Sequence, residues 1–171
     1  MEVQANEHTW VNATDVISKI ENDDEVNLKN SLIFGEINVS SIKLKTIPNP
    51  QYNKLLNEGY STENLVLDGI NENISIVESN IKITDSFFES GLDLSCTSFN
   101  APVDFDGTVF NDSANFAGST FYAPANFNRS TFYAPANFNR STFNDSVYFS
   151  GVDFNDSANF VLSTFNAYTR F

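Results

Sequence analysis

The residue types that most often carry catalysis are scarce in this chain. His8 is its only histidine and Cys96 its only cysteine, so a Ser–His or Cys–His pair is not expected. We also expect no intrachain disulfide and no cysteine-based zinc site, because each needs more than one cysteine. We interpret His8 as a solvated residue of a loose N-terminus and Cys96 as an inert, partly exposed thiol. We therefore expect no catalytic residue, no metal site, no cofactor and no enzymatic activity.

The acidic residues of the C-terminal half do not form the pairs that glycoside hydrolysis requires. If equivalent residues stack 22 positions apart, as argued below, Asp112 and Asp156 share one column but Ala134 stands between them. Their separation would be roughly 9–10 Å, twice the spacing of neighbouring strands. What remains on the expected surface is a set of tyrosines, and we regard Tyr122, Tyr133 and Tyr148 as speculative surface contacts for a partner or a sugar.

The net charge of the chain indicates which kinds of partner it can bind. The formal net charge is −13 and the isoelectric point is about 4.2, which argues against direct nucleic-acid binding because phosphate contacts need Lys and Arg. No apolar run approaches the length of a membrane span, and the first ten residues do not resemble a signal peptide. An extracellular or cell-surface location is favoured if a signal peptide was removed, and a cytoplasmic one otherwise.

Large apolar residues recur from Ile83 onward in steps that alternate strictly between five and six residues. The eleven residues YAPANFNRSTF are written twice without change between Tyr122 and Phe143. A small or aliphatic residue stands two positions before each large one, and both should face the core because side chains two apart share one side of a strand. The expected core ladder consists of Phe88, Phe99, Phe105, Phe110, Phe116, Phe121, Phe127, Phe132, Phe138, Phe143, Phe149, Phe154, Phe160, Phe165 and Phe171.

An eleven-residue period is also three turns of an α-helix. A helix fails here because Phe residues five apart do not form one stripe, and because Pro124 and Pro135 would break it in consecutive repeats. A coil of short strands fits. Alternating steps stay in register only with an even number of sides, and four sides give 22 residues per coil. Glycine is common but not required at the corners, so we expect that the corners do not demand a positive φ.

The repeat resembles the pentapeptide-repeat family, whose units place a small residue two positions before Leu or Phe. The units STFYA, STFND and GVDFN follow this pattern, and the resemblance covers about residues 26–44 and 65–171. The extra residue in every second unit departs from it. The resemblance implies an all-β fold, a right-handed quadrilateral β-helix. Some members of the family resemble DNA in shape and charge and bind DNA gyrase.

We divide the chain into residues 1–25, a flexible N-terminus with a short capping helix over Asp15–Asn22, and a single β-helix domain over 26–171. Alternating pairs such as Leu32/Phe34, Leu65/Leu67 and Ile74/Ile76 predict strands before the regular repeats. Residues 45–64 have two prolines and no period, so they are interpreted as a loop and as the best candidate for a partner site. The chain stops in full repeat register without a polar cap, so either it is part of a longer protein or its last coil pairs with another copy. We expect an end-to-end homodimer through the C-terminal coil.

We favour a non-enzymatic solenoid scaffold or protein-interaction module. One alternative is a DNA-mimicking, gyrase-binding protein, although residues 84–171 carry only nine acidic against three basic residues. The other alternative is a carbohydrate-binding surface protein.

Overall fold

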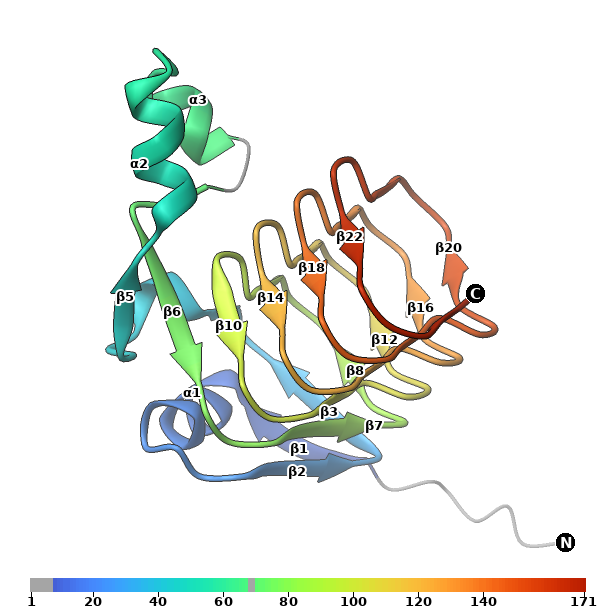
Figure 1. The fold of residues 1–171 in the computed structure, drawn as a ribbon. Coiled ribbons are helices and arrows are strands. Elements are labelled where there is room, and N and C mark those ends of the chain that lie inside the picture. Colours follow the sequence, from blue (N-terminus) through green and yellow to red (C-terminus); the bar gives the residue numbers. More distant parts are fainter. Residues whose placement is uncertain (1–7, 68–69) are drawn as a thin grey trace, which may run out of the picture.

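The computed structural model describes residues 8–67 and 70–171. Short parallel strands wind around one axis and form four sheets, so that the chain is a β-helix solenoid (Figure 1). We call the sheets A to D. Sheet A contains β1 (Thr9–Asn12), β3 (Ser31–Phe34), β8 (Phe87–Phe88), β12 (Val109–Phe110), β16 (Thr131–Phe132) and β20 (Asp153–Phe154). Sheet B contains β2 (Val26–Lys29), β7 (Ile81–Thr84), β11 (Val103–Asp104), β15 (Ala125–Asn126), β19 (Val147–Tyr148) and β23 (Thr169–Arg170).

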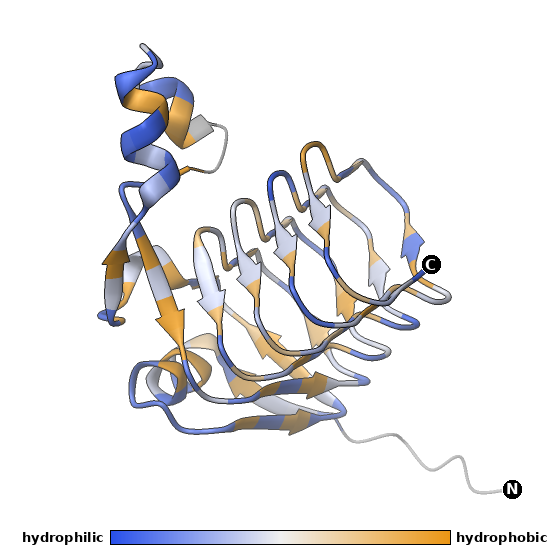
Figure 2. Cartoon of the chain, in the orientation of Figure 1, coloured by the Kyte–Doolittle hydropathy of each residue, from blue (hydrophilic) through white to orange (hydrophobic). Residues whose placement is uncertain are grey.

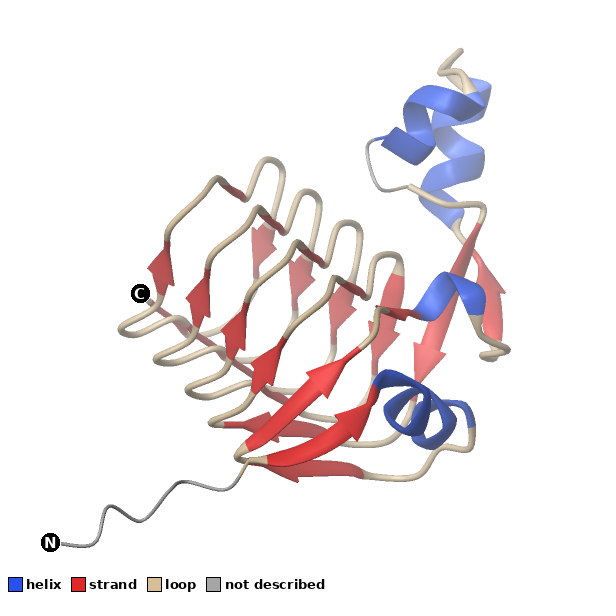
Figure 3. Cartoon of the chain, turned by 180° about the vertical axis from the view of Figure 1, so that it is seen from behind, coloured by secondary structure: helices blue, strands red, loops and turns tan. Residues whose placement is uncertain are grey.

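The other two sheets complete the coil. Sheet C contains β4 (Ile37–Asn38), β9 (Leu92–Asp93), β13 (Ala114–Asn115), β17 (Ala136–Asn137) and β21 (Ala158–Asn159). Sheet D contains β5 (Thr46–Pro48), β6 (Asn73–Val77), β10 (Thr97–Phe99), β14 (Thr120–Phe121), β18 (Thr142–Phe143) and β22 (Thr164–Phe165). In the described residues, three α-helices and one 3-10 turn lie outside the sheets (Figure 3). The helices are α1 (Ala13–Glu21), α2 (Pro50–Asn57) and α3 (Thr62–Leu67), and the turn is Val39–Ser41.

Strand pairing in the regular part joins residues 22 positions apart. Ser98 pairs with Thr120, Thr120 with Thr142, and Thr142 with Thr164. The inward Phe side chains therefore stack in columns: Phe88 to Phe110, Phe110 to Phe132 and Phe132 to Phe154 have ring centroids 5.2, 4.5 and 5.1 Å apart and nearly parallel planes. These distances are close to the spacing of hydrogen-bonded strands, about 4.8 Å, so strand pairing sets the stacking distance.

The small inward residue differs between the sides of the coil. On sheets B and C it is apolar, as at Ala125 and Ala136, and on sheets A and D it is mostly a hydroxyl residue, as at Ser119 and Ser130. The buried Oγ of Ser130 donates to the carbonyl oxygen of Phe105 at 2.7 Å, and Ser119 does the same to Leu94. In the regular coils these hydroxyls thus find a partner in the preceding coil, whereas Ser86 and Thr97 donate to a carbonyl two residues earlier; both satisfy the requirement for burying a polar group.

The corners correct the expectation that no positive φ is needed. At the position two residues after every second anchor the chain turns with φ between 48° and 67°. Arg129 is an example: the N–H of Ser130 donates to the carbonyl oxygen of Phe127, which closes a turn around it. A left-handed φ at the third residue of such a turn is what type II turns require. These corner residues are Asp85, Cys96, Gly107, Gly118, Arg129, Arg140, Gly151 and Leu162.

At the other corners of the regular repeats, the residue before the small inward residue is mostly Pro or Ser. Pro124 occupies the same position in its coil as Ser146, and Pro135 the same as Ser157. Each serine N–H donates to the Oδ1 atom of the preceding aspartate. Proline has no backbone N–H. A corner with Pro in place of Ser therefore needs no aspartate side chain to accept a hydrogen bond there.

The first coils follow a register different from the one predicted. Ser31 and Ile33 face the core, and Ile33 pairs with Phe88, whereas Leu32 and Phe34 point outward. Val77 takes the corresponding position in β6, in place of Ile76. The small inward position accounts for this: Ser31 and Ser75 stand two residues before Ile33 and Val77, and a hydroxyl residue is what this position mostly holds along sheets A and D.

The N-terminal part is more ordered than expected. Residues 1–7 lie outside the described residues, but Thr9–Asn12 form β1, which pairs with β3. The helix begins earlier than predicted, since the Oδ1 atom of Asn12, and not Thr14 or Asp15, accepts the N–H of Thr14 and caps it. Its buried face consists of Ala13, Val16 and Ile20, which pack into the same core as β4 and β2. The helix therefore covers the apolar interior of the first coil.

Candidate functional site

Residues 45–64, expected as an irregular loop, belong to a helical arm. We define the arm as residues 46–72, from β5 through α2 and α3 to the start of β6; residues 68–69 within it are not described. Strand β5 pairs antiparallel with β6, so that Ile47 lies opposite Ile74. In Figure 1 the two helices rise away from the solenoid. Leu65, predicted on a strand with Leu67, instead lies on α3, where its side chain is fully buried.

Asn49 explains why a helix begins in a segment that reads as a loop. Its Oδ1 atom accepts the N–H of Gln51 at 3.0 Å, and its Nδ2 atom donates to the carbonyl oxygen of Asn71 at 2.9 Å. Pro50 follows at the first helical position, where a missing N–H costs nothing. One buried side chain thus caps α2 and ties the two ends of the arm together.

The arm exposes apolar side chains. No residue of α2 is buried. Leu56 is 40% exposed, Tyr60 48% and Val66 58%. In Figure 2 both helices carry orange bands beside blue ones. Leu56 lies on α2, Tyr60 follows that helix, and Val66 lies on α3 next to sheet C. Exposed apolar side chains on such an arm indicate a surface for another molecule.

A hollow of about 250 Å³ separates the arm from the polar outer face of sheet C. The arm contributes Val66 and Asn71, and sheet C contributes Asp93, Asn115 and Asn137. The Nδ2 atom of Asn115 donates to the Oδ1 atom of Asp93 at 3.2 Å, and the Oδ1 atom of Asn115 accepts the N–H of Ala117 at 3.1 Å. These side chains therefore already support the corners and the stacking of the coils.

Cys96 is not the partly exposed thiol that the sequence suggested. Its side chain is buried where the arm meets the solenoid, and its Sγ atom accepts the N–H of Asn71 at 3.2 Å. Burial raises the pKa of the Cys96 thiol, Asp93 raises it further, and the hydrogen bond from Asn71 opposes them. A neutral, buried thiol is a structural group here, not a nucleophile.

The structure does not bring the predicted surface tyrosines together. Tyr122 and Tyr133 are exposed, as expected, but they follow β14 in sheet D and β16 in sheet A. Tyr148 lies on sheet B, where its ring is 6.0 Å from Tyr168, a contact that the sequence interpretation missed. Asp112 and Asp156 stand in one column, where Ala134 separates them. His8 lies near sheet A, far along the chain from either acid.

Several acidic side chains of the solenoid are paired with bases of neighbouring coils. Lys82 lies 3.7 Å from Asp104, and the Nε atom of Arg129 donates to Asp106 at 3.0 Å. Within residues 8–67 and 70–171, no group of three metal-binding side chains is close enough to hold an ion. No helix in that same part of the chain is long and apolar enough to cross a membrane.

The stacked 22-residue register agrees with the comparison to known families. A family model described as pentapeptide repeats (9 copies) matches residues 127–171. This segment consists of pentapeptide repeats. Neither a curated protein nor a solved structure gives a significant match to the chain. In the structure the pentapeptide repeats continue the same strand register back to β10, so the matched segment and the earlier coils form one solenoid.

Proposed function

We propose that this protein is a non-enzymatic scaffold that binds a protein partner through its helical arm. The observation that carries the proposal is that Leu56, Tyr60 and Val66 are exposed on an arm whose two helices rise away from the solenoid. Pentapeptide repeats generally serve as structural or interaction elements. A rigid, ring-filled core fixes the base of the arm, which lowers the entropy that a partner must overcome on binding.

The proposal includes the details of the architecture. The solenoid is taken as a right-handed, quadrilateral coil of about 22 residues, supported by the four sheets and the 22-residue register. Residues 26–171 are taken as one domain, supported by one apolar cluster that includes Val26 through Phe149 and that α1 shares through Ala13, Val16 and Ile20. Crossover connections between parallel strands are right-handed in almost all proteins.

The two alternatives have less support. A DNA mimic should carry uncompensated acids along one face, but Asp104 and Asp106 are each paired with a base. A carbohydrate-binding face would be expected to gather aromatic rings, yet Tyr122 and Tyr133 stand on different sheets.

We also propose that two copies associate end to end through the C-terminal coil. Phe171 is 72% exposed, and Val161 and Leu162 of the same last coil are also exposed. Analytical ultracentrifugation over a range of concentrations is expected to show a monomer–dimer equilibrium that Val161→Ser with Leu162→Ser shifts toward the monomer. A sedimentation coefficient that stays monomeric and independent of concentration contradicts this.

The arm is tested with a triple variant, Leu56→Ser, Tyr60→Ser and Val66→Ser. Partners of the intact chain are captured by affinity purification, identified by mass spectrometry and purified for a binary binding measurement. The triple variant is expected to lose the partner while its circular dichroism spectrum stays unchanged. Tyr122→Ser with Tyr133→Ser is the control, because it removes exposed aromatic side chains from two other faces of the solenoid. Equal binding by the triple variant and the intact chain would reject the arm as the site.

A further inference from the structure

The outer face of sheet A differs from the other faces in its first four coils. Strand pairing places Trp10 beside Leu32, Leu32 beside Phe87, and Phe87 beside Val109. All four are outward positions, because the residues that follow each of them face the core. We call this column of four side chains the apolar stripe. It ends at the next strand, where the same column continues as Thr131 and Asp153.

The corresponding columns of the other sheets are polar in the regular coils. On sheet B the column reads Lys82, Asp104, Asn126, Tyr148 and Arg170, and on sheet C it reads Asp93, Asn115, Asn137 and Asn159. The stripe therefore does not follow from the repeat itself. A contiguous apolar column on an outer face is a feature that soluble proteins use for binding.

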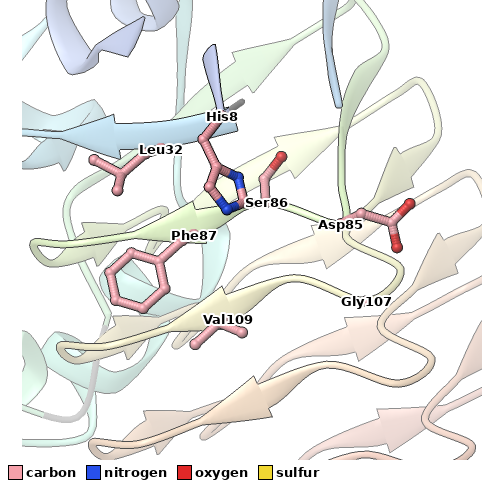
Figure 4. A pocket seen from close by; sticks show the side chains of 7 residues that line it. All are labelled: His8, Leu32, Asp85, Ser86, Phe87, Gly107 and Val109. Atoms are coloured by element: carbon pink, nitrogen blue, oxygen red, sulfur yellow. The ribbon is translucent and has the colours of Figure 1, made fainter. Parts of the chain in front are cut away.

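The stripe borders a hollow of about 260 Å³. Figure 4 shows Leu32, Phe87 and Val109 on successive strands along one side of it, with His8 and Asp85 on the other sides. Trp10 is 72% exposed at the edge of the sheet, and its ring centroid lies 6.3 Å from that of Phe34. Leu32, Phe87 and Val109 line the hollow itself, and Trp10 continues their column beyond it because it pairs with Leu32.

Acidic groups flank the stripe. Asp85 and Glu89 stand two residues before and two residues after Phe87, both exposed. Asp85 lies 3.7 Å from Lys29, and both side chains are exposed, so a basic partner at Asp85 would replace a pair that contributes little. The whole chain has a net charge of −13. A second copy of this chain would bring acids against acids, so charge complementarity favours a basic partner.

We propose that the apolar stripe binds a basic amphipathic helix of another protein. Four strands cover about 14 Å along the axis, which about three helical turns span. The apolar face of the helix lies on Leu32, Phe87 and Val109, and its Lys or Arg residues face Asp85 and Glu89. This recognition follows the helix-in-groove mode. It goes beyond the proposed function of the arm, because it concerns a separate face of the solenoid.

Trp10 is the only tryptophan, so its emission reports binding directly. The probe is a synthetic peptide of Leu and Lys, without tryptophan, in a helical pattern of about four turns, and its control replaces every Lys by Glu. The full chain is titrated with each peptide at low salt and at about 0.5 M salt. We expect a saturable blue shift of the emission with the Lys peptide, weakened by salt, and no shift with the Glu peptide.

The decisive variants are Phe87→Thr and Val109→Thr, which insert the residue that Thr131 provides in the same column. Together they are expected to weaken binding of the Lys peptide at least about tenfold. The matched control is Tyr122→Asn, on sheet D, which inserts the residue of Asn144 and Asn166 and is expected to leave binding unchanged. Unfolding curves of all three variants verify that the fold is intact.

Three outcomes would overturn the proposal. Equal binding by the Phe87→Thr, Val109→Thr variant would place the peptide elsewhere on the acidic surface. A concentration-dependent dimer that the same two substitutions abolish would assign the stripe to a second copy. If the peptide bound only after removal of residues 1–7, the N-terminal segment and not another protein would be the occupant of the stripe. None of these results bears on the arm, whose variant is measured separately.

Discussion

The Oγ atom of Ser130 donates a hydrogen bond to the carbonyl oxygen of Phe105, 2.7 Å away, and both residues are completely buried. The same bond recurs from Ser119 to Leu94 and from Ser141 to Phe116. It links each coil to the one before it through a side chain, in addition to the backbone ladder. A hydroxyl in the core is therefore a stacking element of this solenoid.

Replacing Ser130 by Ala is expected to lower the free energy of unfolding by about 1 kcal/mol, the usual net worth of one buried hydrogen bond. The carbonyl oxygen of Phe105 keeps the N–H of Thr108 as a partner, so the loss stays moderate. Urea denaturation measures it. Thr131→Ala, the outward neighbour, serves as the control and should change stability by less than about 0.5 kcal/mol. Equal losses at both positions would show that the buried bond has no special role.

Phe127 and Phe171 offer a comparison within one column of rings. Phe127 is fully buried and stacks on Phe149 at 5.2 Å, whereas Phe171 stacks on Phe149 from the other side and is largely exposed. Phe127→Ala is expected to cost about 3–5 kcal/mol, because it leaves a cavity between two coils. Phe171→Ala should cost far less when measured on the monomer by thermal or urea unfolding. Similar costs would contradict a column packed from within.

Gly107 and Gly151 test the two separate reasons for glycine at a corner. Both have a positive φ, of 66° and 67°. A Cβ atom at Gly107 would lie 2.7 Å from the Oδ1 atom of Asp85, whereas at Gly151 the nearest atom would be 4.0 Å away. Gly151→Ala is expected to cost about 1–2 kcal/mol from the backbone alone. Gly107→Ala should cost more, and Gly107→Ala with Asp85→Ala should return toward the Gly151 value. Unfolding curves that rank the two single variants in reverse would disprove the steric contribution.

The buried thiol of Cys96 predicts a specific dependence on pH. Because its pKa is raised in the folded protein, the folded state holds the thiol proton more tightly than the unfolded chain. This contribution to stability is complete below the ordinary thiol value of about 8.5 and declines as pH rises from there through the raised value. The difference in unfolding free energy between the natural chain and Cys96→Ala, measured from pH 7 upward, should therefore shrink. A difference that is constant with pH would contradict the burial of Cys96.

The alternating spacing of Phe was sufficient to predict the outward columns, the exposure of Tyr122 and Tyr133 and the ladder of rings that is buried from Phe88 to Phe149. Phe171, at the end of the predicted ladder, is instead 72% exposed, because no further coil covers it. These features depend on a local rule, since side chains two apart share a face and successive coils repeat the same order of residues. The matched pentapeptide repeats lie where this rule is strictest. Where the pattern weakens, as at Leu32 and Phe34, the large residues did not predict which side chains face the core. The small residue Ser31 marks the inward register there.

The remaining features depend on contacts that no local pattern contains. Asn49 makes a helix of a segment rich in proline, because its side chain bonds to Asn71 across the base of the arm. Cys96 is buried because that arm covers it. The apolar stripe forms only when β3 pairs with β8, on the other side of the arm in sequence. This pairing joins Trp10 and Leu32 to Phe87 and Val109. The sequence by itself determined which side chains point inward in the regular repeats. Tertiary pairing decided which outward side chains become neighbours, because that depends on register between strands far apart in the chain.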